Sequence, residues 1–146
     1  MTKVLYTAEA RVTGGRDEGH ARTSDGALEV DIRAPQELGG PGGGTNPEQL
    51  FAAGYAACFE SAVKLVGRRM KAEADDVAVD SRVQLLTTEE RGFTLGVELD
   101  VTLPSVADQE QAAEIVRKAH AACPYSRATR GNIDVALSAN GQPVQG

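Results

Sequence analysis

The sequence has no excess of basic residues. Its 146 residues include 15 Lys and Arg against 21 Asp and Glu, which gives a formal net charge of −6. Proteins that bind nucleic acid or anionic membrane surfaces generally present a basic face to them. The composition therefore argues against both kinds of partner.

Long apolar runs are also missing. The longest covers residues 50–59 and ends at Glu60, whereas a membrane-spanning helix needs about 20 residues. The first ten residues include Lys3 and Glu9 and contain no hydrophobic segment like that of a signal peptide. We expect a protein that does not cross a membrane and stays in the cytoplasm.

Cysteine is scarce as well, since Cys58 and Cys123 are the only two. Structural disulfides are rare in the cytoplasm, and no Cys-x-x-Cys motif is present. The pair is interpretable as two buried apolar residues or as a redox pair whose members meet in the fold. A zinc site that adds His20 and His120 has none of the usual ligand spacings. We expect no metal, and we expect both histidines at the surface.

The chain length is typical of one domain, here residues 1–146. Apolar and polar residues alternate over residues 4–12, which predicts a half-buried strand, and a turn at residues 24–26 precedes a hairpin strand over 27–32. A glycine-rich loop fills residues 35–45. A long helix then begins at Pro47, with Asn46 as its cap and Gln49 reaching back. Small residues on every side of this helix predict that it is buried.

The second half of the chain alternates over residues 77–85 and 95–103, with a turn at 89–92 between the two predicted strands. Ser105 and Asp108 have the spacing of a capping box, followed by a helix that buries one apolar face and stops before Pro124. A last strand over residues 133–137 precedes a polar tail. Hairpins between neighbouring strands indicate an α+β fold of antiparallel strands.

Two sequence blocks carry a resemblance. Residues 46–59 read NPEQLFAAGYAACF, and residues 123–126 read CPYS, followed by ATRGN at 128–132. These blocks resemble the signatures of the OsmC/Ohr superfamily, and the GGRD at residues 14–17 is similar to its organic hydroperoxide resistance branch. The chain departs from the family pattern at Glu18, which separates Arg16-Asp17 from Gly19, and at Arg127, where the family usually has Asn.

The resemblance implies an OsmC-like fold, an intertwined homodimer and a thiol peroxidase for organic hydroperoxides such as alkyl and fatty-acid hydroperoxides. Cys58 would be the peroxidatic cysteine and Cys123 the resolving one, with Arg16 and Glu48 as the ion pair that stabilises the thiolate. A Cys58–Cys123 disulfide would then be reduced by dihydrolipoamide or a lipoylated protein, without a bound cofactor. The apolar side chains suited to binding such a substrate are Phe51, Tyr55, Phe59 and Tyr125.

Helical spacing adds one inference about assembly. Glu48 and Cys58 lie ten residues apart on the predicted helix, which is about 15 Å along its axis. If both belong to one site, Glu48 and the Arg16 bound to it come from a second subunit, and we expect an obligate homodimer with composite sites.

Two other functions compete with this one. A non-peroxidatic member of the superfamily would bind an apolar small molecule and keep its cysteines as core residues. A general peroxiredoxin is disfavoured, because the chain lacks the alternating strands and helices of a thioredoxin fold.

Overall fold

The computed structural model describes residues 2–90 and 92–146 and divides the chain into two compact units, residues 1–50 and 51–146. The expected turn at residues 89–92 includes Arg91, which lies outside the described residues. We describe each unit by itself, and the single-domain expectation stays a prediction.

The first unit is built on a three-stranded antiparallel sheet in the order β1-β2-β3. Its strands are β1 (Ala10–Thr13), β2 (Gly19–Thr23) and β3 (Glu29–Ile32), and a short 3-10 helix, η1 (Gln36–Leu38), follows in the predicted loop. The hairpin between β2 and β3 is as predicted. The strand predicted over residues 4–12 is wrong for its first part: residues 2–9 form no strand and are exposed.

Helix α1 (Pro47–Arg69) begins where the sequence predicts. The Asn46 side chain caps it by accepting a hydrogen bond from the backbone N–H of Gln49 at 2.8 Å. Gln49 does not reach back to Asn46 as expected, because its Oε1 accepts from the Thr45 hydroxyl instead. The sequence predicted that α1 is buried on every side. In this chain it is not, because Ala53, Ala57 and Ser61 are exposed.

Helix α1 is long and apolar enough to cross a membrane by length and composition. One such helix is weak evidence for a span, because a core helix of a soluble protein passes the same test. The residues that α1 buries belong to the protein's own packing: Tyr55, Phe59, Ala62, Val63, Val66 and Gly67.

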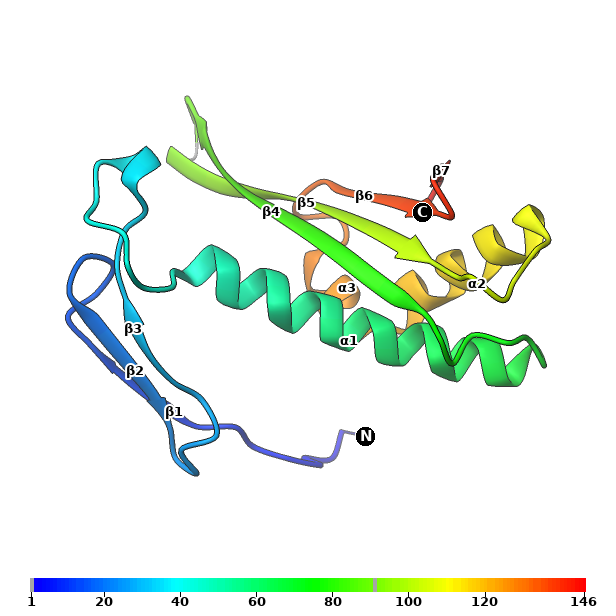
Figure 1. The fold of residues 1–146 in the computed structure, drawn as a ribbon, viewed down its shortest axis with the longest axis horizontal. Helices are drawn as coiled ribbons and strands as arrows, with labels where there is room; N and C mark the ends of the chain where they lie inside the picture. Colours follow the sequence, from blue (N-terminus) through cyan, green and yellow to red (C-terminus); the bar gives the residue numbers. More distant parts are fainter. Residues whose placement is uncertain (1, 91) are drawn as a thin grey trace. The chain divides into compact units, whose positions relative to one another are not determined.

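The second unit holds a four-stranded sheet in the order β4-β5-β6-β7. Its strands are β4 (Ala78–Thr88), β5 (Gly92–Thr102), β6 (Val135–Ala139) and β7 (Gln142–Val144), and its further helices are α2 (Gln109–Ala122) and α3 (Pro124–Thr129). In Figure 1 the helices of this unit lie along one face of the sheet, and alternate residues of β5 are buried there. The shared core includes Tyr55, Phe59, Leu99, Ile115, Val116 and Cys123.

Several sequence expectations for this unit need correction. Strands β4 and β5 pair antiparallel as predicted, but β6 lies parallel to β5, because α2 and α3 form a crossover between them. The predicted polar tail forms β7, which pairs with β6. The cap of α2 is Asp108, whose side chain accepts from the N–H of Glu110, while Ser105 donates to Asp76.

Candidate functional site

The two cysteines meet in the second unit. Cys58 lies on α1, and Cys123 is the residue between α2 and α3. Pro124 cannot continue α2 but suits the first turn of a new helix, so the chain turns at Cys123 and directs it toward α1. The two Sγ atoms lie 3.5 Å apart and both thiols are free. Cys123 is fully buried and Cys58 is partly accessible.

The surroundings of Cys58 within this unit favour the thiol over the thiolate. Burial raises the pKa of the Cys58 thiol, and the neighbouring Cys123 raises it further, while a hydrogen bond from the backbone N–H of Tyr125 lowers it. None of the groups in the described chain that shift this pKa is a cation. A reactive thiolate at Cys58 therefore requires a positive charge that this unit does not supply.

The four predicted aromatic residues form one cluster beside the cysteines. Phe51 stacks on Tyr125 at 6.0 Å between ring centroids, and Tyr55 meets Phe51 edge-on at 5.8 Å. Tyr55 and Phe59 have no exposed surface, and the assignment of all four rings to substrate binding stays a prediction. Phe51 and Tyr125 are the accessible members.

Glycine at position 54 allows the Tyr125 ring to approach α1. A Cβ atom there would lie 3.1 Å from the Tyr125 hydroxyl and 3.4 Å from Cε2 of its ring. The aromatic cluster thus depends on glycine, which has no side chain, at position 54, one helical turn before Cys58.

A buried polar network adjoins the cysteines, and sequence reasoning missed it. The Tyr55 hydroxyl lies 2.8 Å from Ser126 Oγ, which lies 2.8 Å from Nδ1 of His120. His120 was expected at the surface; it is buried instead, because Ser126 gives its ring nitrogen a partner. Burial and the charge of Arg130 lower the pKa of His120. Six-residue spacing between a histidine and a serine carries no recognisable signal.

The predicted ion pair is present in the first unit. Both Nη atoms of Arg16 donate to the Glu48 carboxylate, at 2.8 and 3.2 Å. These hydrogen bonds raise the pKa of the Arg16 guanidinium and lower that of the Glu48 carboxyl. Insertion of Glu18 into the family pattern leaves this two-point contact in place. The loop needs glycine at position 14, where φ is +83° and a Cβ would lie 2.1 Å from the Glu18 carbonyl oxygen.

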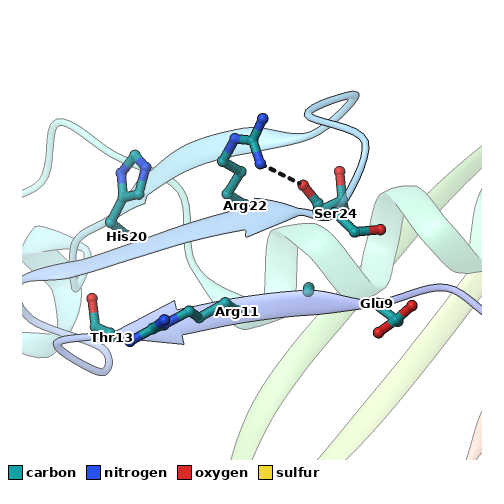
Figure 2. Close-up of a pocket in the computed structure, with 8 residues that line it drawn as sticks. Glu9, Arg11, Thr13, His20, Arg22 and Ser24 are labelled. Carbon is teal, nitrogen blue, oxygen red and sulfur yellow. Dashed lines mark hydrogen bonds between the residues drawn. The ribbon is translucent and has the colours of Figure 1, made fainter.

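A separate cavity of about 580 Å³ lies on the first unit. Figure 2 shows Arg11, His20 and Arg22 beside it, on β1 and β2. His20 is exposed, as expected, and its ring nitrogens contact Asp31 and Glu29 at 2.9 and 3.0 Å. These contacts raise the pKa of His20. None of the predicted site residues lines this cavity.

No group of three or more His, Cys, Asp or Glu side chains that could hold a metal ion occurs within residues 2–90 and 92–146. His20 and His120 lie in different units, each with hydrogen-bond partners of its own.

Comparison with known proteins identifies the family. The family described as OsmC-like protein matches residues 40–138. An organic hydroperoxide resistance protein of Xanthomonas axonopodis pv. citri (strain 306) is 53% identical over 138 residues, which are 93% of this chain and 95% of that one. The chain belongs to the OsmC-like family, in its organic hydroperoxide resistance branch.

Solved structures agree with this OsmC-like assignment. The crystal structure of an organic hydroperoxide resistance protein from Legionella pneumophila is 54% identical, has a TM-score of 0.88, and covers 93% of this chain and 98% of its own. One from Vibrio cholerae, with captopril bound in one of the active sites, is 41% identical with a TM-score of 0.90, covering 97% and 96%.

Proposed function

We propose that this OsmC-like protein is a thiol-dependent peroxidase that reduces organic hydroperoxides to alcohols. The observation that carries the proposal is the 3.5 Å separation of the Cys58 and Cys123 Sγ atoms, with only Cys58 accessible. The names of its relatives support a role in organic hydroperoxide resistance. The accessible rings of Phe51 and Tyr125 suit an alkyl or acyl chain better than hydrogen peroxide.

The chemistry proceeds in three balanced steps. The Cys58 thiolate attacks the terminal oxygen of R–OOH; the O–O bond breaks, an S–O bond forms, and the alkoxide takes a proton to leave as R–OH. The thiol of Cys123 then attacks the Cys58 sulfenic acid, which forms the disulfide and releases water. This second step protects Cys58 from further oxidation to sulfinic acid.

In the third step a dithiol reduces the Cys58–Cys123 disulfide back to two thiols and is itself oxidised to a disulfide. We propose dihydrolipoamide or a lipoyl group carried by another protein as this reductant, so that no cofactor stays bound and the lipoyl dithiol is oxidised to its disulfide. We also place the protein in the cytoplasm, where a pair of free thiols is maintained between turnovers.

The Arg16–Glu48 pair is the proposed source of the charge that Cys58 lacks. Arg16 presents a planar set of donors that stabilises a thiolate and orients peroxide oxygens, and Glu48 holds the guanidinium at two points. Because Glu48 and Cys58 are ten residues apart on α1, which is about 15 Å along the axis, we propose that the pair comes from the second subunit of a homodimer.

Exposed apolar surface supports a dimer. Val4, Leu5 and Tyr6 are each at least 79% exposed, on a segment that continues into β1 at the edge of its sheet. On α1, the exposed small side chains of Ala53, Ala57 and Ser61 permit close approach of another chain. Such surface is costly to leave in water.

The decisive experiment follows the consumption of an alkyl hydroperoxide with dihydrolipoamide as reductant. We expect rapid turnover by the wild-type protein and its loss in Cys58→Ser. Slow wild-type turnover, no faster than that of Cys58→Ser, would overturn the proposal and favour a binding protein. In that case Cys58 would also react slowly with alkylating reagents at neutral pH.

A further inference from the structure

Helix α3 has little of its own to hold it in place. It is six residues long, and its N-cap, Cys123, makes no side-chain capping hydrogen bond. Isolated helices this short are unstable in water. The resolving cysteine therefore sits at the start of a helix that depends on contacts with the rest of the unit.

Those contacts come from the buried network. Tyr55 on α1 meets Ser126 on α3 at 2.8 Å and Thr129 on α3 at 3.1 Å, and Ser126 meets His120 on α2 at 2.8 Å. Arg130, which follows α3, donates to the backbone carbonyl of His120 at 2.8 Å. The network thus ties together the three helices that meet at the cysteine pair.

The network also flanks both cysteines in the sequence. Tyr55 precedes Cys58 by three residues on α1, which places both near the same face of that helix. His120 precedes Cys123 by three residues, and Ser126 follows it by three. Any slide of α3 along α1 that changes the Sγ–Sγ distance must therefore also stretch the Tyr55–Ser126 hydrogen bond.

Hydrogen bonds fix such an arrangement more sharply than apolar packing does, because they are directional and because an unmade one is costly in a buried site. Ser126 has no exposed surface. Within the described chain, no buried side-chain nitrogen or oxygen is left without a partner, so the network is complete in the observed position of α3.

We propose that Tyr55, Ser126 and His120 are positioning residues that hold the Cys123 thiol against Cys58 and so give the pair its high effective concentration for disulfide formation. The biological purpose of this arrangement rests on the proposed peroxidase function. The physical claim does not, because it concerns the equilibrium between two thiols and a disulfide.

The test equilibrates the full-length protein with reduced and oxidised glutathione and measures the effective concentration of the Cys58–Cys123 pair. No hydroperoxide is present. We expect Tyr55→Phe and His120→Leu to lower it about 10-fold or more, since each breaks a buried hydrogen bond that fixes α3. His120→Asn keeps an acceptor near the position of Nδ1, and we expect it to stay within about 3-fold of the wild type.

Ser81→Ala is the matched control. It removes a hydrogen bond of the same 2.8 Å length, from Ser81 Oγ to the Ala52 carbonyl, which joins β4 to α1 without involving α2 or α3. We expect it to lower stability and leave the effective concentration unchanged. If His120→Leu does not fold, Tyr55→Phe, which loses only a hydroxyl, decides alone.

The inference is overturned if folded Tyr55→Phe keeps the wild-type effective concentration, or if Ser81→Ala lowers it equally. A protein that passes this test yet consumes no hydroperoxide would instead refute only the proposed function. If the positioning role and the proposed peroxidase function both hold, slower disulfide formation leaves the Cys58 sulfenic acid exposed for longer. The Tyr55→Phe protein treated with hydroperoxide then accumulates more Cys58 sulfinic acid than the wild type, detectable by mass spectrometry.

Discussion

The reactivity of Cys58 depends on charges that compete at one sulfur atom. Burial and Cys123 disfavour the thiolate, and the N–H of Tyr125 favours it only in part, so that the pKa stays raised. Arg16 is the cation that the sequence blocks associate with this cysteine. In the proposed site, the two-point contact with Glu48 arranges the donors of Arg16 before a peroxide arrives.

Arg16→Lys tests whether the shape of this cation matters as well as its charge. Lysine cannot bind a carboxylate at two points with a planar set of donors. We expect the rate of Cys58 oxidation by an alkyl hydroperoxide to fall by about 10-fold or more, since a hydrogen bond to a charged group contributes about 1.5–3 kcal/mol. Stopped-flow measurement of the first turnover checks this.

Thermal unfolding provides the control for Arg16→Lys. Half-exposed ion pairs contribute only about 0–1 kcal/mol to stability, and Arg16 is 48% exposed in its side chain. An equal rate in the variant, with the fold intact, would contradict a positioning role for the guanidinium.

His120 makes a pH-dependent contribution to stability. Burial, then Arg130, lower its pKa in the folded protein, whereas in the unfolded chain it titrates near 6.5. Below about pH 6.5 the unfolded state therefore binds the extra proton first, and stability falls as the pH drops toward the folded pKa, by at most about 1.4 kcal/mol per pH unit. Above that window the contribution is constant.

Urea unfolding at pH 7.5 and 5.5 measures this effect, with His120→Asn as a comparison that keeps an acceptor but does not titrate. We expect the wild type to lose more stability on acidification than His120→Asn does. Equal losses in the two proteins would show that His120 is not held neutral by the fold.

At the scale of elements, the sequence was informative where a strand has its partner nearby in the chain. The alternation over residues 77–85 and 95–103 predicted β4 and β5, which pair with each other. The same alternation over residues 4–9 did not produce a strand: the Glu9 carbonyl accepts from the N–H of Ser24 at 3.0 Å, but residues 2–9 stay exposed and extend no ladder. An alternating pattern predicts that one face of a segment is apolar, but it does not predict which strand lies beside that segment.

Other elements were missed for physical reasons. Pro124 ends α2 because proline cannot continue a helix, but it also begins α3, where proline suits the first position. Alternation does not distinguish parallel from antiparallel pairing, so the sequence pattern could not predict that β6 runs parallel to β5. Among the candidate site residues, the motifs predicted the contact within each pair, Cys58 with Cys123 and Arg16 with Glu48. The burial of His120 depended on a partner that only the fold brings to it.

The turn between β6 and β7 depends on one asparagine. Asn140 has a positive φ of 48°, and its side-chain oxygen accepts from the N–H of Leu103 at 2.7 Å. Its amide nitrogen donates to the carbonyls of Leu103 and Val106. The Asn140 side chain thus links the β6–β7 turn to the backbone that follows β5.

We expect Asn140→Ala to destabilise the protein by about 2–4 kcal/mol, because it leaves the N–H of Leu103 without its partner and strains the left-handed backbone. Asn140→Gly tolerates that backbone conformation and loses only the hydrogen bonds, so it should be less destabilised. Urea unfolding of both variants checks this, and equal losses would show that the backbone conformation contributes nothing.

At the scale of the whole molecule, the proposed reaction needs residues from both units of the chain, the Arg16–Glu48 pair of the first and the cysteine pair of the second. Cys58 lies ten residues beyond Glu48 on a continuous α1, and neither Cys58 nor the Arg16–Glu48 pair supplies what the other has. A dimer would combine them if one subunit contributes its cysteine pair and the other its Arg16–Glu48 pair to each site. The two-fold symmetry of such a dimer would produce two equal sites.

Mixing the impaired variant Arg16→Lys with the inactive variant Cys58→Ser tests that assembly. Arg16→Lys keeps Cys58, and Cys58→Ser keeps Arg16, so a heterodimer built across subunits has one complete site and one lacking both residues. After denaturation and joint refolding, half of the dimers are mixed, and we expect about a quarter of the wild-type sites to be restored. Sites within single chains would give no recovery, because neither variant then holds both residues. Light scattering should meanwhile give twice the 15.3 kDa mass of one chain, and a monomer that turns over hydroperoxide would rule out the composite site.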